Sequence, residues 1–367
     1  MSTNESGEDA QEVMISSEVR AVEEVLNAFS YYATFGKDKV LSMIRQMRNI
    51  PQEHQLLIGG QFKEHINNVR ERIEKNQEVL KMITSHGVGM FGEDFTKALR
   101  IHQQRRPTSD FISKVLSTMR QICREWSSEG IPEREATFSP IIAELDKHFP
   151  KESTSRHNIK VLVPGCGLGR LAHELIEEGY SVQGNEFSFF MLLTSCFILN
   201  SCKTVNEHTI YPFLFDKSNS WTYEDQIRGV SFPDSIPSKD NLVRQNLFAM
   251  SAGDFLETVN DSCFDSIVTA WFLDTAHNVL EYIQAIHKSL NEGGVWINVG
   301  PLTWHYEGVH NELSIELPYS EIMRLIVLTG FEVINEKRID SNYTVNRSSM
   351  LQNQFTCAFF SARKRKT

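Results

Sequence analysis

Cysteines are scarce in this sequence and form no metal-site pattern. The 367 residues contain six of them, and no two make a C-x-x-C pair. Disulfide frameworks and structural zinc sites are usually recognised by cysteines at paired spacings. We therefore expect reduced thiols and no bound metal, as in a cytoplasmic or nuclear protein.

Long apolar runs and an excess of basic charge are also missing. No apolar run reaches the roughly 20 residues that a membrane helix needs, and the first nine residues lack the basic and apolar regions of a signal peptide. The formal net charge is -10, from 37 basic and 47 acidic residues, whereas general binding to nucleic-acid phosphates needs a basic surface. These absences predict a cytoplasmic protein without a membrane or nucleic-acid partner. A basic run at 363–366 keeps a nuclear location open as the weaker alternative.

The most informative feature that is present is a glycine loop at 165–169. An apolar run leads into Gly165-x-Gly167-x-Gly, a helical pattern follows at once, and the next predicted strand ends at Glu186. This order of strand, glycine turn, helix, strand and acid is typical of a site that holds an adenosine ribose at the carboxyl edge of a parallel sheet. Gly165, Gly167 and Glu186 are therefore candidate cofactor-binding residues.

The spacing of the glycines discriminates between two cofactor classes. Nicotinamide enzymes use G-x-G-x-x-G, and here Arg170 occupies the position of the last glycine. The shorter G-x-G-x-G run suits S-adenosylmethionine, which has no pyrophosphate to place under the loop. A tight turn without a ligand is the structural alternative, and a nicotinamide dehydrogenase is the rival enzyme class.

The two halves of the chain differ in periodicity. Residues 1–16 are polar and acidic and are expected to form a disordered tail, and 17–150 show helical periodicity alone. Strands and helices alternate through 151–367, apart from 201–242, which is rich in Asn, Ser, Asp and Pro and is expected to be an insertion over the sheet edge. We expect an α/β, Rossmann-like sheet of seven mostly parallel strands with helices on both faces, preceded by an all-helical region. The predicted strands are 159–164, 181–186, 246–252, 264–271, 294–299, 331–337 and 355–362, and the helices between them include 170–178, 187–200, 278–290 and 319–329.

Ligands of a parallel sheet bind where the strands end, so each predicted strand end is a candidate position for chemistry. Asp254 and Phe255 follow the third strand; in a methyltransferase they would bind the adenine amino group and pack on its ring, although Asp254 can equally cap the next helix. Asp274 follows the fourth strand, at the position where the methyl group of the donor and the substrate would meet. The alternative is that Asp274 only caps the next helix. We interpret the neighbouring His277 as structural. His305, beyond a Gly-Pro break after the fifth strand, is expected in the pocket.

Taken together, these segments resemble the carnosine N-methyltransferase family, a branch of the class I S-adenosylmethionine-dependent methyltransferases. The resemblance covers roughly residues 20–362. The matching segments are 121–126, 140–142, 164–171, 184–188, 251–255, 274–278, 296–298, 300–302 and 312–317. One stretch departs from the family pattern, because 350–355 contains no tyrosine where the family has an aromatic cluster. That departure leaves substrate choice open.

The resemblance implies a complete site. Gln121 and Arg124 would reach the methionine carboxylate of the cofactor, which the planar guanidinium of an arginine matches well. Asp274, His305 and Tyr343 would bind the substrate. The implied reaction methylates an imidazole ring nitrogen of a histidine-containing dipeptide, as in the conversion of carnosine to anserine.

This reaction gives the two catalytic candidates distinct roles. Asp274 would accept the imidazole N–H, orient the ring and stabilise the positive charge that develops on it. His305 would hold the ring or take the surplus proton. Alternatives are a methyltransferase of peptide or protein histidine, and a non-catalytic methyltransferase-like binding protein that docks through its helical half. The oligomeric state stays open, with a homodimer as one alternative.

Overall fold

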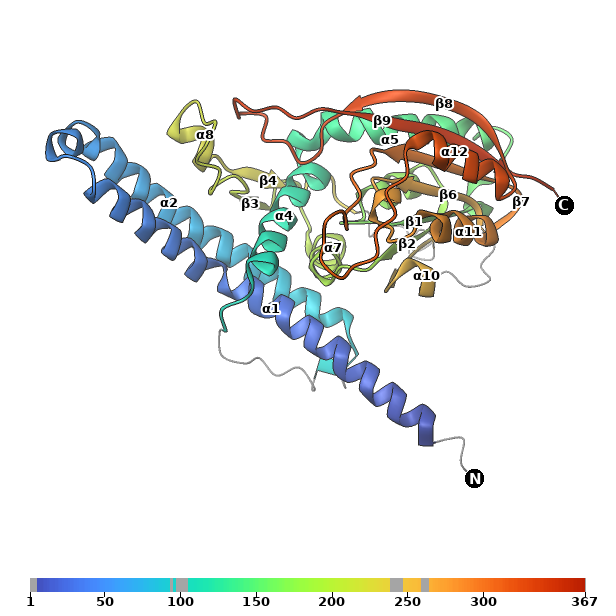
Figure 1. Cartoon of the computed structure of the whole chain (residues 1–367), viewed down its shortest axis with the longest axis horizontal. Helices are drawn as coiled ribbons and strands as arrows, with labels where there is room; N and C mark the ends of the chain where they lie inside the picture. The colour runs from blue at the N-terminus through green and yellow to red at the C-terminus, as the bar shows by residue number, and fades with distance from the viewer. Residues whose placement is uncertain (1–4, 93–94, 97–104, 238–246, 259–263, 367) are drawn as a thin grey trace. The chain divides into compact units, whose positions relative to one another are not determined.

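The computed structural model describes residues 5–92, 95–96, 105–237, 247–258 and 264–366 (Figure 1). The chain divides into two compact units. The first comprises Met1–Glu129, Phe189–Ile236 and Asn346–Gln352, and the second comprises Gly130–Ser188, Pro237–Val345 and Asn353–Thr367. The division differs from the predicted boundaries, because the helix before the sheet belongs to the second unit and most of the predicted insertion belongs to the first.

A seven-stranded sheet forms the centre of the second unit. Its strand order is β5-β2-β1-β6-β7-β9-β8, and β9 runs in the direction opposite to the other six strands. The strands are β1 (Lys160–Pro164), β2 (Ser181–Glu186), β5 (Phe248–Ala252), β6 (Phe264–Ala270), β7 (Leu290–Gly300), β8 (Phe331–Ser341) and β9 (Phe355–Lys364). Each corresponds to a predicted strand, and the predicted Rossmann-like fold class is confirmed.

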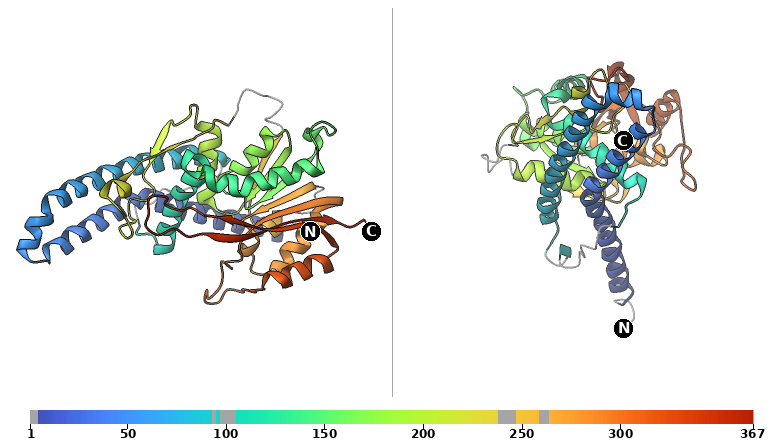
Figure 2. Two further views of the ribbon diagram at one scale, coloured as in Figure 1. Left: turned by 90° about the horizontal axis from the view of Figure 1, so that it is seen from above. Right: turned by 90° about the vertical axis from the view of Figure 1, so that its left-hand side faces the viewer.

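Helices cover both faces of this sheet (Figure 2, left). Helices α5 (Ile131–His148) and α6 (Arg170–Glu177) pack on one face, and α11 (Val279–Ser289) and α12 (Tyr319–Leu328) pack on the other. Alternate residues of β1 serve the two faces, since Val161 and Val163 join one apolar cluster and Leu162 joins the other. The period of two along the strand thus builds both cores at once.

The first unit contains the long helices α1 (Glu5–Arg48) and α2 (Gln52–Gly87), followed by η1 (Val88–Met90), and the helices α4 (Ser109–Trp126) and α7 (Phe189–Ser201). Figure 1 shows α1 and α2 as an antiparallel hairpin. It turns at Pro51, the N-cap of α2, because proline cannot continue the preceding helix. The composition of 1–16 predicts a disordered tail, whereas α1 already begins at Glu5; residues 1–4 lie outside the described part of the chain.

The predicted insertion has secondary structure of its own and packs on the helices of the first unit. It contains β3 (His208–Ile210), α8 (Tyr223–Ile227) and β4 (Val230–Phe232), and β3 and β4 pair as an antiparallel ribbon; its last residues, 238–242, lie outside the described ranges. Asn76 of α2 accepts a hydrogen bond from Tyr211 N at 2.8 Å and donates to Tyr211 O at 3.0 Å. Arg120 of α4 donates to Asp216 at 2.6 Å. These bonds explain why the segment groups with the helices.

In the described part of the chain, no helix has the length and apolarity needed to cross a membrane. The same residues contain no cluster of three or more His, Cys, Asp or Glu side chains that could hold a metal ion.

Candidate active site

The glycine loop lies between β1 and α6 and has left-handed backbone geometry. Gly165, Gly167 and Gly169 have φ of 62°, 59° and 83°, a region that glycine enters without strain. A Cβ on Gly165 would lie 2.5 Å from Cδ2 of Phe272. Glycine is therefore needed at 165 by the protein's own packing, a cause that the sequence pattern did not reveal.

Glu186, the last residue of β2, holds this loop. Its Oε2 accepts the N–H of Gly167 at 2.8 Å, and its Oε1 accepts the N–H of Ser188 at 2.8 Å. The side chain is buried, and burial raises the pKa of the Glu186 carboxyl while backbone N–H donors from Ser188, Gly167 and Phe187 oppose the rise. A carboxylate offers about four acceptor positions, so some remain for the hydroxyls of a ligand.

The end of β5 carries the two predicted adenine residues. Oδ1 of Asp254 accepts the N–H of Leu256 at 2.8 Å, so this carboxylate does cap the short helix α10 (Phe255–Thr258). The cap uses one oxygen, and an adenine contact through the other stays a prediction. Phe255 is 2% exposed, and its ring packs edge-on against Phe272 and Tyr282, with centroids 5.4 and 5.2 Å away. Because the Phe255 ring is so enclosed, a ligand could contact little more than its edge.

Asp274 lies in the short helix η4 (Leu273–Thr275) directly beyond β6 and is 2% exposed. Its Oδ2 accepts two hydrogen bonds from Thr303, from the backbone N–H at 2.9 Å and from the hydroxyl at 2.6 Å. Its Oδ1 accepts no hydrogen bond from any residue that the structure describes. The carboxylate is therefore fixed in orientation through one oxygen and available for a donor through the other.

The alternative interpretation of Asp274 as the cap of the following helix is wrong. The N-cap of α11 is Asn278, whose side chain accepts the N–H of Leu280 at 3.2 Å. The neighbouring His277 has a structural contact, as predicted. Its Nδ1 lies 2.8 Å from the carbonyl oxygen of Leu313, and its ring stacks on Tyr306 with centroids 3.6 Å apart.

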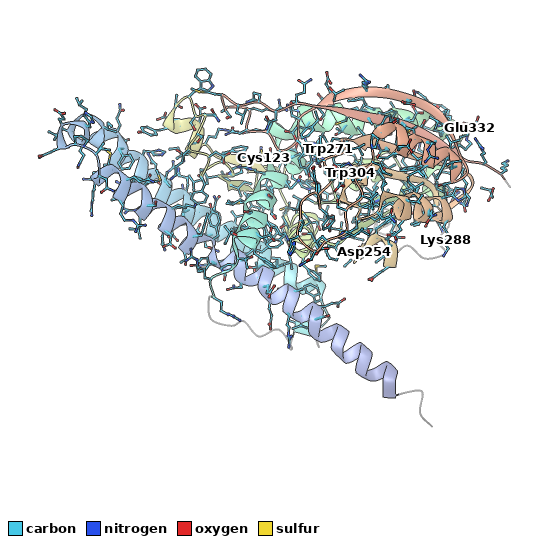
Figure 3. The ribbon with its side chains drawn as sticks, in the orientation of Figure 1. Cys123, Asp254, Trp271, Lys288, Trp304 and Glu332 are labelled. Carbon is cyan, nitrogen blue, oxygen red and sulfur yellow. The ribbon has the colours of Figure 1, made fainter. Side chains whose placement is uncertain are left out.

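His305 reaches the same strand edge through its backbone. Its N–H donates to the carbonyl oxygen of Asp274 at 2.9 Å, and its side chain is exposed to solvent. The preceding Trp304 has a φ of 47° and is buried, which turns the chain sharply at this point. The structure thus brings the segments of Asp274 and His305 together across about 30 residues of sequence. Trp304 is labelled in Figure 3, together with Trp271, which follows β6, and Asp254, which follows β5.

Tyr343, the third predicted substrate residue, packs against a residue that sequence reasoning missed. Its ring centroid lies 4.5 Å from that of Trp271, the residue that follows β6. Trp271 also meets Phe355 edge-on at 5.4 Å and has a φ of 57°. The left-handed backbone conformation distinguishes Trp271 from its neighbours, and this conformation cannot be predicted from the sequence.

Gln121 and Arg124, the predicted carboxylate-binding pair, lie in the first unit on α4. They are one helical turn apart and therefore share a face. Arg124 is buried, and its Nη1 lies 3.7 Å from Oε1 of Glu125. Their role in cofactor binding stays a prediction.

Thr303 is the second residue that the sequence did not reveal. It anchors Asp274 from a loop 29 positions away, and an isolated threonine between apolar residues carries no local signal. Only the fold brings the two side chains into contact.

The sheet and its carboxyl edge define a class. A glycine loop after β1, held by the acidic end of β2, is the arrangement of Rossmann-like α/β proteins with a site for an adenosine-containing cofactor.

Comparison with known proteins identifies the family within this class. The family model described as carnosine N-methyltransferase matches residues 101–366. Carnosine N-methyltransferase of Mus musculus is 42% identical over 93% of this chain and 85% of its own length. That of Schizosaccharomyces pombe is 37% identical, over 91% of this chain and 93% of its own length. The chain therefore belongs to the carnosine N-methyltransferase family, and the resemblance found in the sequence is confirmed.

Proposed function

We propose that this protein transfers a methyl group from S-adenosylmethionine to an imidazole ring nitrogen of a carnosine-type dipeptide, with an anserine-type product. Membership in the family supports the reaction class. The observation that carries the ring-nitrogen assignment is the geometry of Asp274, which is buried, held through Oδ2 by Thr303 and open through Oδ1 within the described part of the chain.

The residues at the carboxyl edge fit the cofactor. Glu186 has acceptor positions left for ribose hydroxyls, and Asp254 has one oxygen outside its helix cap. When bound, S-adenosylmethionine supplies an electrophilic methyl group. The protein must then hold the acceptor nitrogen in line with that group, and alignment of this kind can lower a barrier by about 7–11 kcal/mol.

Asp274 can supply the alignment. A neutral imidazole has one N–H and one nitrogen lone pair. If Oδ1 accepts the N–H, the lone pair is directed to the opposite side of the ring, where methylation takes place. The same carboxylate faces the positive charge that forms on the ring during the transfer, and the attraction between them stabilises the transition state.

His305 can dispose of the proton that the methylated ring loses. Its backbone is tied to Asp274, and its exposed imidazole can exchange a proton with bulk water. We assign it this role, together with contact to the acceptor, and we assign Tyr343 a place in the acceptor wall.

The proposed location is the cytoplasm, with the basic run at 363–366 as a candidate nuclear signal. Its first two residues belong to β9, and Lys364 donates to the carbonyl oxygen of Leu290 at 2.9 Å. Only the last part of the run is therefore outside the sheet, which favours the cytoplasm.

The acceptor is tested by incubating the purified chain with methyl-labelled S-adenosylmethionine and a panel of carnosine, free histidine, a histidine-containing peptide and a histidine-rich protein. We expect label on the imidazole of carnosine, located by tandem mass spectrometry, at a higher rate than on the larger acceptors. Faster labelling of the peptide or protein would instead establish the alternative, a methyltransferase of peptide or protein histidine. Labelling of none of them would refute the proposal.

A further inference from the structure

A buried carboxylate behind the Tyr343 segment has no place in the function described so far. Glu133 lies in the first turn of α5 and is 3% exposed. Its Oε2 accepts the N–H of Thr344 at 2.8 Å, and its Oε1 accepts the N–H of Val345 at 3.0 Å. Burying a charge is costly unless it is paired or hydrogen-bonded, and here both oxygens are used to hold two consecutive backbone amides.

The turn that Glu133 holds is strained. Thr344 has a φ of 49°, a left-handed conformation that is uncommon for a β-branched residue. Such strain persists only where the surroundings enforce it, and it is concentrated at functional sites. Two charge-assisted hydrogen bonds from a buried carboxylate are a sufficient constraint. Glu133 therefore fixes the backbone directly after Tyr343.

The partner of that ring is strained as well. Trp271 has a φ of 57°, and its indole lies 4.5 Å from the Tyr343 ring at an interplanar angle of 37°. The indole nitrogen Nε1 is buried and has no hydrogen-bond acceptor among the residues that the structure describes. A buried N–H without a partner is rare and costly in a folded protein. It follows that a ligand oxygen at this position would gain a hydrogen bond.

We propose that Glu133 is a positioning residue that sets Tyr343 against Trp271, and that the Trp271 indole N–H donates to an oxygen of the bound acceptor. The two rings then form one wall of the acceptor site, and the N–H selects molecules that carry a carboxylate or carbonyl oxygen beside the imidazole. This inference rests on the proposed function, since it assigns a further specificity contact to the same acceptor. Trp271 follows β6 only three residues before Asp274, which places both donor and carboxylate at one strand end.

The Trp271→Phe variant tests the hydrogen bond, because phenylalanine keeps an aromatic ring and lacks the N–H. We compare wild type and variant with carnosine and with histamine, which has the imidazole but no oxygen. For carnosine the variant should raise KM by about tenfold, the usual scale of one lost hydrogen bond to a charged group. For histamine the two proteins should have equal KM. An equal loss with both acceptors would overturn the inference.

The Glu133→Gln variant tests the positioning role, with Glu135→Gln as the matched control on the exposed side of the same helix. Glutamine has only one acceptor oxygen, so it can accept a hydrogen bond from only one of the two backbone N–H groups. Its own NH2 group would face the other N–H. We expect a higher KM for carnosine with kcat close to wild type, a lower melting temperature because one backbone amide loses its acceptor, and no change in the control. If the melting temperature falls and the folded fraction shows no change in KM, Glu133 has a structural role only. If Glu133→Gln does not fold, the Trp271→Phe variant decides the inference.

The two hypotheses fail in different ways. If wild type neither methylates carnosine nor binds it in calorimetry, the proposed function is wrong and this inference falls with it. If wild type methylates carnosine and Trp271→Phe has no selective effect, only the inference is wrong.

Discussion

The two units of this chain are stabilised in different ways. In the second, local strand and helix patterns build two apolar clusters, one on each face of the sheet. In the first, polar side chains of α2 and α4 join these helices to a segment that is distant in sequence. Asn76 contacts Tyr211 across 135 positions, and Arg120 contacts Asp216 across 96. The comparison teaches that local pattern suffices to predict the order of elements in a layered sheet, whereas the attachment of the 201–236 segment to the helices of the first unit depends on contacts between residues distant in sequence.

The residues expected to carry the chemistry also differ in location from those expected to stabilise the fold. The candidate catalytic side chains lie at strand ends of the second unit, outside its apolar clusters. Substitutions there should change rates and affinities. Substitutions of the polar anchors in the first unit should change the free energy of unfolding.

The largest effect is expected for Asp274→Asn. The amide oxygen of asparagine can still accept from Thr303, so the fold should hold, but the charge that faces the imidazolium is lost. We expect kcat for carnosine to fall by ~10²–10³-fold, the range for loss of one group that stabilises transition-state charge, with an unchanged melting temperature. A loss of less than about threefold, well below that range, would remove Asp274 from the catalytic machinery.

Asn76→Ala should break the first unit. The side chain of Asn76 donates to Tyr32 Oη at 2.7 Å as well as bonding both backbone groups of Tyr211. Its loss leaves these groups without partners, at about 1–3 kcal/mol for each one that stays buried. We expect a net destabilisation of about 2–3 kcal/mol in chemical denaturation. The exposed Asn67→Ala on the same helix is the control and should be neutral.

Two glycines should respond to alanine with opposite signs. Gly165→Ala meets Phe272 and a left-handed φ of 62°, so it should destabilise the second unit by about 1–3 kcal/mol. Gly59 lies inside α2, where an added Cβ would meet no described atom within 4 Å, and Gly59→Ala should stabilise by about 0.5–1 kcal/mol. Melting curves of both variants check the pair. If both substitutions changed the melting temperature in the same direction, backbone conformation would not be the reason for glycine at position 165.

The smallest effect at neutral pH is expected from Glu186. Burial raises the pKa of this carboxyl. Ribose hydroxyls bind the ionised form better, so affinity for S-adenosylmethionine should fall as pH drops below that raised pKa, by at most about tenfold per pH unit because one proton is involved. Calorimetry at a series of pH values from alkaline to acidic measures this slope. Glu186→Gln, which carries no proton to lose, should bind more weakly with a flat profile, and a steep profile in that variant would assign the titration to another group.

Much of the second unit could be predicted from the sequence. The glycine loop, Glu186 and the strand ends at Asp254 and Asp274 are local patterns, and their positions follow from the rule that parallel strands end at one edge. The fold class and the family are confirmed. The sequence leaves the cap of α11 ambiguous because Asp274 and Asn278 are both good N-cap residues and lie one helical turn apart.

The domain boundaries are less accessible from the sequence. The polar composition of 201–242 indicates an interruption of the sheet, but not its attachment to α2 and α4. That attachment rests on Asn76 and Arg120, which as single polar residues on amphipathic helices look like solvent-facing positions. Sequence pattern groups α5 with the preceding helices, because periodicity does not report which neighbour a helix packs against.

The sequence by itself determined the order of strands and helices, the edge at which ligands bind and the family, because period, glycine spacing and strand-end acids are local properties of the chain. Only the tertiary structure decided that Thr303 orients Asp274, that Glu133 holds the turn beside Tyr343, and that the Trp271 N–H has no acceptor in the described part of the chain. The bond from Glu133 to Thr344 joins residues 211 positions apart, and hydrogen bonds at such separations exist only after the sheet has brought its edges together.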